Sequence, residues 1–152
     1  MTRIDNTGLC SMGSVQQQRI ILKRELGELD RLGSWIQTFQ GELELVADIA
    51  FALELCLEEV IANIIMHGGP RGAGEISITL QQTSPGLVAT IEDDGVQFDP
   101  TAAPRRARAQ SLDDARPGDH GIQLIRTFAT DMRYECNRGL NTLTLTFAAA
   151  GA

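Results

Sequence analysis

The sequence predicts an α+β fold, a two-layer sandwich in which helices cover one face of a mixed, mostly antiparallel sheet. Three observations predict this class. Two segments in the first half of the chain carry apolar residues at the spacings of amphipathic helices. Two pairs of segments with alternating apolar and polar residues flank turn signals and predict hairpins. A short amphipathic segment between the hairpins completes the order strand, helix, helix, hairpin, loop, helix, hairpin.

The composition indicates one domain without covalent staples. The chain has 152 residues, of which 43% are hydrophobic and 22% charged, and this is enough to bury a core. Its net charge of -7 argues against direct binding of nucleic acid, because such proteins cluster Lys and Arg against the phosphates. The three cysteines are far apart and form no disulfide framework or zinc motif.

The first residues predict a flexible tail over 1–18, followed by a single domain over 19–152. The tail has one Arg and no apolar block of signal-peptide length. Carboxylates interrupt the most apolar helical segment, so it does not meet the length and charge criteria of a membrane span. We therefore expect a soluble, cytoplasmic protein that does not contact a membrane.

The first half of the domain predicts a strand and two helices. Branched apolar residues predict a short strand over 19–26. A helix over 28–39, ended by Gly41, is predicted by an apolar stripe at spacings of three and four: Leu29, Leu32, Trp35, Ile36 and Phe39. A longer stripe predicts a second helix over 43–66, which the glycines and proline after His67 end.

The second half predicts two hairpins around a loop and a helix. Alternating segments over 75–81 and 87–91 flank Ser84-Pro85-Gly86 and predict the first hairpin. The Arg-rich stretch over 100–117 lacks apolar periodicity and predicts a mobile surface loop or lid. A short helix follows over 121–129, and the last hairpin is predicted over 132–136 and 141–147.

The second helix carries the first candidate for chemistry. Glu59 and Asn63 are one turn apart, only about 40° around the helix axis, on an edge beside the apolar stripe. Alone, such a pair is more often a solvated helical pair than an active site. Asp93-Asp94-Gly95 is by itself first a turn signature, and Gly118 with Gly121 is by itself a weak phosphate signal.

Together, three motifs in this order resemble a known family. They are Glu-x-x-x-Asn from Glu59 to Asn63, followed by His67-Gly68; Asp93-Asp94-Gly95-Val96-Gln97-Phe98-Asp99-Pro100; and Gly118-Asp119-His120-Gly121 leading into Ile122. This pattern is similar to that of the GHKL ATPases, which have the Bergerat nucleotide-binding fold. More narrowly, the chain resembles the anti-sigma-factor serine/threonine protein kinases of the RsbW type, over about residues 20–147.

The resemblance implies a role for each matching residue. Glu59 matches the catalytic carboxylate that assists the acceptor hydroxyl, and Asn63 matches the ATP-binding amide that ligates Mg²⁺. Asp93 matches the aspartate that accepts a hydrogen bond from the adenine amino group, beside Gly95, which lets the backbone pass close to the base. Gly118 and Gly121 match glycines whose backbone approaches the phosphates of ATP. The stretch over 100–117 then corresponds to the ATP lid.

Two residues depart from the family pattern. Gln97 stands where relatives commonly have Gly or Pro, and Asp119 stands where a second Gly is usual. A carboxylate at Asp119 would repel the phosphates unless it points to solvent or to the metal ion.

The resemblance implies an ATP-dependent serine/threonine kinase that acts as an anti-sigma regulatory factor in a partner-switching system. Its partners would then be a sigma factor or an anti-sigma-factor antagonist protein, and it would be able to form a homodimer. A non-catalytic, nucleotide-responsive binding module that sequesters a regulatory partner is the alternative, which Asp119 keeps open. A histidine-kinase catalytic domain is a third interpretation. The sequence argues against it, because no phosphoacceptor-histidine helix precedes the motifs.

Overall fold

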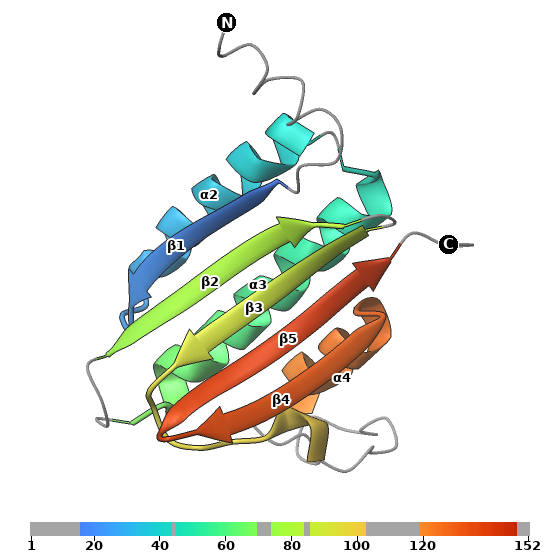
Figure 1. The fold of residues 1–152 in the computed structure, drawn as a ribbon. Coiled ribbons are helices and arrows are strands. Elements are labelled where there is room, and N and C mark those ends of the chain that lie inside the picture. Colours follow the sequence, from blue (N-terminus) through green and yellow to red (C-terminus); the bar gives the residue numbers. More distant parts are fainter. Residues whose placement is uncertain (1–15, 44, 70–73, 84–85, 103–118, 149–152) are drawn as a thin grey trace, which may run out of the picture.

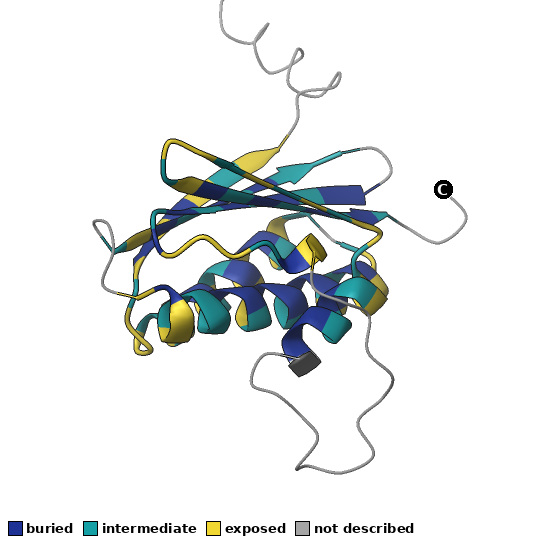
Figure 2. Cartoon of the chain, turned by 90° about the horizontal axis from the view of Figure 1, so that it is seen from below, coloured by how far each residue is buried: buried dark blue, intermediate teal, exposed yellow. Residues whose placement is uncertain are grey.

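The computed structural model describes residues 16–43, 45–69, 74–83, 86–102 and 119–148. Residues 1–15 of the predicted tail, residues 103–117 of the predicted lid and Gly118 lie outside the described residues, whereas residues 17 and 18 of the predicted tail belong to the first strand. Within them the chain forms two layers, a sheet and a layer of helices (Figure 1). Figure 2 shows the helices on one side of the sheet, as the sequence predicts.

The sheet has five strands in the order β1-β2-β3-β5-β4. Every pairing between neighbouring strands is antiparallel, so the described sheet has no parallel pair, although a mixed sheet is predicted. The strands are β1 (Gln17–Lys23), β2 (Glu75–Gln82), β3 (Gly86–Asp93), β4 (Asp131–Asn137) and β5 (Leu140–Ala148). Both predicted hairpins are confirmed. The turn of the second contains Arg138 and Gly139, both with positive φ (52° and 82°), as a tight two-residue hairpin turn requires.

Alternation along the strands explains which face the helices cover. Ile76, Ile78 and Leu80 of β2 are fully buried, whereas the intervening Ser77 and Thr79 are half-buried on the other face. The helices complete the same core with apolar side chains on their inner faces, led by the fully buried residues Leu32, Ile36, Phe39, Leu53, Leu57 and Ile61.

The helical layer consists of α2 (Glu28–Leu43), α3 (Ala47–His67) and α4 (Asp119–Phe128), with a short 3-10 turn η1 (Pro100–Ala102). The predicted end of the first helix at Gly41 is wrong, because α2 continues to Leu43. Leu43 packs against the core, and this burial offsets the cost of a glycine inside a helix, about 1 kcal/mol. The second helix therefore begins at Ala47 rather than at residue 43. None of the described helices combines the length and hydropathy needed to cross a membrane.

The end of α3 is fixed by glycines. Gly68 donates its N–H to the carbonyl of Ile64 at 2.8 Å, and Gly69 adopts a φ of +69°, which favours glycine. Gly68 also accepts a hydrogen bond from the N–H of Val96, at 2.9 Å. The C-terminal end of α3 is thus tied to the loop that follows β3.

Candidate functional site

The polar edge of α3 lies where α4 packs against that helix. Glu59 and Asn63 are both half-buried there, and Gly121 of α4 is buried. A Cβ atom at Gly121 would lie 2.9 Å from Oε2 of Glu59 and 3.1 Å from Nδ2 of Asn63. The structure therefore brings these three predicted site residues together, and glycine leaves the space in which the two polar side chains sit.

The chemistry at this point combines a carboxylate, an amide and a helix N-terminus. Gly121 is the third residue of α4, so the N–H groups of the first turn, which carry partial positive charge, lie beside Glu59 and Asn63. Among the described residues, no group of three His, Cys, Asp or Glu side chains could hold a metal ion. A metal ion here would depend on Asn63 and on oxygen atoms of a ligand, which is a donor set that suits Mg²⁺.

The remaining parts of the predicted phosphate region are only partly described. Gly118 lies outside the described residues. Asp119 begins α4, but its side chain is not described, so the effect of its carboxylate on a phosphate stays a prediction. Gln97 is exposed in the loop after β3.

Asp93, predicted to contact adenine, is the last residue of β3 and is only 7% exposed. Its Oδ2 atom accepts hydrogen bonds from the N–H of Gly95 at 2.9 Å and from Nδ2 of Asn141 at 3.4 Å. Within the described residues, both donors use the same oxygen, which leaves Oδ1 to accept a hydrogen bond from a ligand. Burial raises the pKa of Asp93, against the lowering effects of the bonds from Gly95 and Asn141.

Asn141 faces Asp93 from β5 and is 5% exposed. Besides Asp93, its Nδ2 atom donates to the carbonyl oxygens of Gly95 at 3.2 Å and Val96 at 3.4 Å. Its Oδ1 atom accepts a hydrogen bond from the hydroxyl of Tyr134 at 2.5 Å. Burial, together with Cys136, raises the pKa of Tyr134 to about 12, so this hydroxyl keeps its proton and remains a donor. Tyr134 thereby fixes the orientation of the Asn141 amide, with Nδ2 toward Asp93.

Arg24, directly after β1, packs against the other side of the same loop. Its side chain is 8% exposed, and its Nη1 atom lies 3.7 Å from Oδ1 of Asp94. A Cβ atom at Gly95 would lie 2.6 Å from Nη1 of Arg24 and 2.8 Å from the carbonyl oxygen of Gly68. Position 95 therefore has no room for a side chain, and Arg24 joins the ends of β1 and α3 to the loop after Asp93.

Replacing Arg24 with Met is expected to destabilise the folded protein by about 2 kcal/mol, because it breaks an ion pair in which the arginine is 8% exposed and Asp94 is 33% exposed. Urea unfolding followed by circular dichroism measures this difference. Arg133→Met is the matched control. Its pair with Asp131 is short, at 2.9 Å, but Arg133 is 82% exposed, so the loss should stay below about 0.5 kcal/mol. Equal losses in the two variants would contradict a structural role of Arg24.

Cys56, one turn before Glu59 on α3, is buried, and desolvation, reinforced by the charge of Glu59, raises the pKa of its thiol to about 12. The thiol therefore stays protonated and is a poor nucleophile or metal ligand.

The sequence analysis missed Arg24, Tyr134 and Asn141. Asn141 carries a signal that could have revealed it, because it occupies an inward position of a strand whose other inward residues are Leu143, Leu145 and Phe147. A buried amide among apolar residues needs partners, and here these are Asp93 and the hydroxyl of Tyr134. Arg24 had no comparable signal, because an arginine at the end of a strand is most simply a solvated charge.

The chain is similar to a known protein family and to a known kinase. The family model of the histidine kinase-like ATPase domain matches residues 22–147. The serine/threonine-protein kinase BtrW of Bordetella bronchiseptica is 41% identical over 117 residues, which cover 76% of this chain and 82% of BtrW.

A crystal structure of the RsbU and RsbW domains of Rv1364c from Mycobacterium tuberculosis superposes with a TM-score of 0.63 at 13% identity. The match covers 88% of this chain but only 32% of the mycobacterial chain, and at this identity the similarity concerns the fold.

Proposed function

The chain belongs to the family of histidine kinase-like ATPase domains, and from this membership we propose that it is a serine/threonine protein kinase that uses Mg-ATP. The observation that carries the proposal is the meeting of Glu59, Asn63 and Gly121 at the N-terminus of α4. The similarity to BtrW, which is named a serine/threonine-protein kinase, supports the same activity. The proposed system is partner switching, with a sigma factor or an anti-sigma-factor antagonist as protein partner and a homodimer as the proposed assembly.

In the proposed site, the adenine amino group donates to Oδ1 of Asp93, and the phosphates lie against the first turn of α4 near Gly121. Mg²⁺ would be held by the amide oxygen of Asn63 and by phosphate oxygens, and when bound it neutralises charge on the phosphates. We propose that Gly118 contributes a further backbone N–H to the phosphates.

The proposed reaction moves one phosphoryl group. The hydroxyl oxygen of the acceptor serine or threonine forms a bond to the γ-phosphorus, and the bond from that phosphorus to the β,γ-bridging oxygen breaks, so that ADP leaves. Glu59 accepts the proton of the hydroxyl. In such a transfer the protein forms no covalent bond to the phosphoryl group. Much of the catalysis therefore comes from positioning of the nucleotide by Asn63, Gly121 and Asp93.

The proposal is tested by incubating the protein with γ-labelled ATP, Mg²⁺ and an antagonist protein encoded beside it. Label is expected on a serine or threonine of the antagonist. If the protein binds Mg-ATP but labels no such partner, the non-catalytic binding module is the better description. If calorimetry detects no nucleotide binding, the assignments of both Asp93 and Asn63 are wrong.

Replacing Gly121 with Ala is expected to lower the transfer rate about tenfold without destabilising the fold. The new methyl group would displace the ends of the Glu59 and Asn63 side chains, whereas alanine is the better residue inside a helix. Thermal unfolding and single-turnover transfer measure the two effects. Gly33→Ala in α2 is the matched control, because a Cβ atom there meets nothing within 4 Å, and its transfer rate should not change.

The affinity for ATP is expected to fall in mild acid because the pKa of Asp93 is raised. The ionised carboxylate accepts the hydrogen bond from adenine, so binding is complete above the raised pKa and is lost as the pH falls through it. The loss should begin above pH 3.8, the usual value for an Asp side chain. Protonation of the nucleotide itself affects both proteins alike. Its effect therefore cancels in the ratio of the wild-type affinity to the affinity of Asp93→Asn at each pH. A constant ratio would contradict the prediction.

A further inference from the structure

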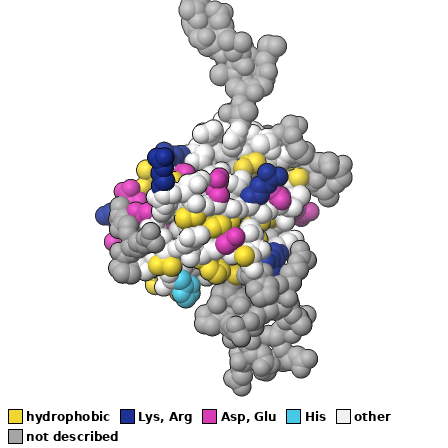
Figure 3. Space-filling view, turned by 60° about the horizontal axis from the view of Figure 1, so that its bottom comes forward, with side chains coloured by type: hydrophobic (Ala, Val, Ile, Leu, Met, Phe, Trp, Pro, Cys, Tyr) yellow, Lys and Arg dark blue, Asp and Glu magenta, His cyan; other side chains and the backbone are white. Residues whose placement is uncertain are grey.

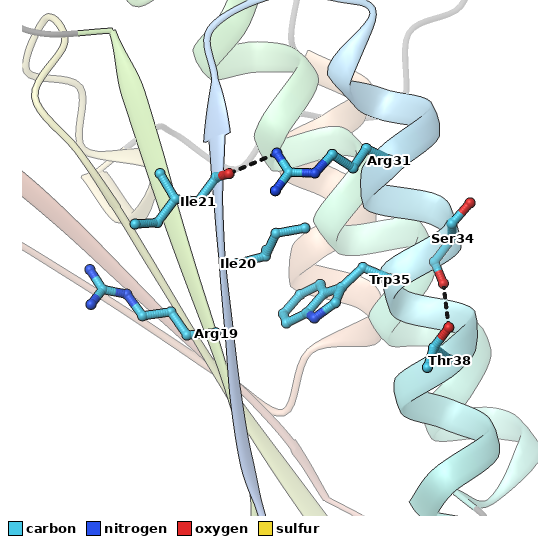
Figure 4. A pocket seen from close by; sticks show the side chains of 7 residues that line it. All are labelled: Arg19, Ile20, Ile21, Arg31, Ser34, Trp35 and Thr38. Atoms are coloured by element: carbon cyan, nitrogen blue, oxygen red, sulfur yellow. Dashed lines mark hydrogen bonds between the residues drawn. The ribbon is translucent and has the colours of Figure 1, made fainter.

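A groove of about 650 Å³ lies between β1 and α2, on the side of α3 that faces away from α4 (Figure 1, Figure 4). Its lining includes Arg19 and Ile21 of β1 and Arg31, Ser34, Trp35 and Thr38 of α2. Figure 4 shows the Trp35 ring between the helix and the strand. Because α2 and α4 flank α3 on opposite sides, the groove is separate from the candidate nucleotide site.

The groove follows a free edge of the sheet as described, because β1 is the first of the described strands in the sheet order. The carbonyl of Gln16 accepts from Gln82, and the N–H of Arg24 donates to Gly74, so even-numbered residues of β1 bond toward β2. In an antiparallel pair, the intervening residues turn their N–H and C=O groups the other way. The odd-numbered residues of β1 therefore present backbone groups at the free edge.

One end of this edge is already capped by side chains. The N–H of Lys23 donates to Oε1 of Glu28 at 3.0 Å, and the carbonyl of Ile21 accepts from Nη1 of Arg31 at 2.9 Å. Within the described part of the chain, no such bond reaches the N–H of Ile21 or the backbone groups of Arg19. These two residues therefore offer two donors and an acceptor in the spacing of a strand.

The charged side chains that line the groove are both arginines. Arg19 is exposed and is oriented by a hydrogen bond from its Nε to Oγ of Ser77 at 2.8 Å, whereas Arg31 is 56% exposed and its Nη1 atom lies 3.4 Å from Oε1 of Glu28. Figure 3 shows Lys and Arg side chains interspersed with Asp and Glu on one face of the molecule. In a chain of net charge -7, Arg19 thus makes this edge of the groove a local site of complementary charge for carboxylates.

We propose that this groove binds an extended, acidic segment of a partner protein, which pairs with the free edge of β1 as an additional strand. Backbone hydrogen bonds to Arg19 and Ile21 supply affinity, as in other cases of strand addition. Side chains of an added strand alternate between its two faces. Carboxylates on one face meet Arg19, and apolar side chains on the other face pack on Trp35. The inference needs neither nucleotide nor phosphoryl transfer, so it stands independently of the proposed kinase activity.

Trp35 provides the readout, because it is the only tryptophan in the sequence. The probe is a fluorescein-labelled peptide of about ten residues in which Glu and Val alternate. Titrating it into the full chain without nucleotide is expected to raise the anisotropy and, with an unlabelled copy of the peptide, to change Trp35 emission. Arg19→Glu should weaken binding about tenfold or more. Arg133→Glu, an equally exposed charge reversal on β4 at the opposite sheet edge, should leave it within about twofold.

Two further peptides separate strand pairing from charge alone. A copy with Lys in place of Glu, and a copy with N-methyl groups on alternate backbone amides, are both expected to lose binding. Unchanged binding of the methylated peptide would show that the peptide does not pair as a strand. Equal losses of binding in Arg19→Glu and Arg133→Glu would show that the peptide does not bind at this groove. No change in either signal also overturns the proposal. A chain that sediments as a dimer, and that Arg19→Glu converts to a monomer, would assign the edge to a second copy instead.

Discussion

Glu59→Gln is expected to lower the rate of phosphoryl transfer by about 10²- to 10⁴-fold and to leave the affinity for Mg-ATP nearly unchanged. The glutamine side chain is as large as that of Glu59 and would occupy the same half-buried position. Its amide, however, cannot accept the proton of the acceptor hydroxyl. Single-turnover transfer and isothermal titration calorimetry separate the two quantities. A loss confined to the rate identifies a group that acts on the reacting hydroxyl.

Glu58→Gln is the matched control for this variant. Glu58 is the adjacent carboxylate on α3 and is exposed, whereas Glu59 lies beside Gly121. The control should transfer phosphate within about twofold of the wild-type rate. A wild-type rate in Glu59→Gln, or a loss of the same size in Glu58→Gln, would show that Glu59 is not the base.

Asp93→Asn is expected to weaken ATP binding about a hundredfold, the loss of a buried hydrogen bond to a charged acceptor. Among the described residues, Gly95 and Asn141 both donate to Oδ2 of Asp93, which leaves Oδ1 for the proposed ligand. The introduced asparagine has a single side-chain oxygen for both tasks. If this oxygen keeps the protein donors, the NH₂ group of the new side chain faces the adenine amino group, and two donors oppose each other.

The same reversal predicts a change of base preference. Guanine carries an oxygen where adenine carries the amino group, so Asp93→Asn should bind GTP better relative to ATP than the wild type does. Competition between the two nucleotides measures this ratio. Glu92→Gln, on the half-buried outer face of the same strand, should change neither affinity. A uniform loss of both nucleotides in Asp93→Asn would point to a damaged loop rather than to base recognition.

Much of this architecture was predictable from short-range patterns. The alternation over 75–81 and 141–147 specified strands because every second side chain is buried, and the stripe on α3 specified which face of the helix is inside. The proximity of Glu59 and Asn63 was predictable because residues four apart lie on the same side of a helix. The end of α2 was not, since Leu43 is held by packing against the core rather than by local sequence.

The proposed adenine end of the site shows the limit of such patterns. Asn141 and Asp93 are 48 residues apart in the chain, and only the register of β3 with β5 brings them together. Arg24 likewise lies near Asp94 because segments distant in the sequence pack together, and no periodic sequence pattern relates the two residues. Interactions of this kind depend on tertiary structure, so a single sequence indicates the residue types but not their partners.

The pairing of Asp93 with Asn141 also has a kinetic consequence. Contacts between residues distant in the chain require closure of a long loop, and they form late when a protein folds. A partly folded chain, with α3 formed but β3 not yet paired with β5, would lack the proposed adenine contact. Nucleotide would then bind the native state alone, so a saturating concentration should slow unfolding while leaving the refolding rate almost unchanged.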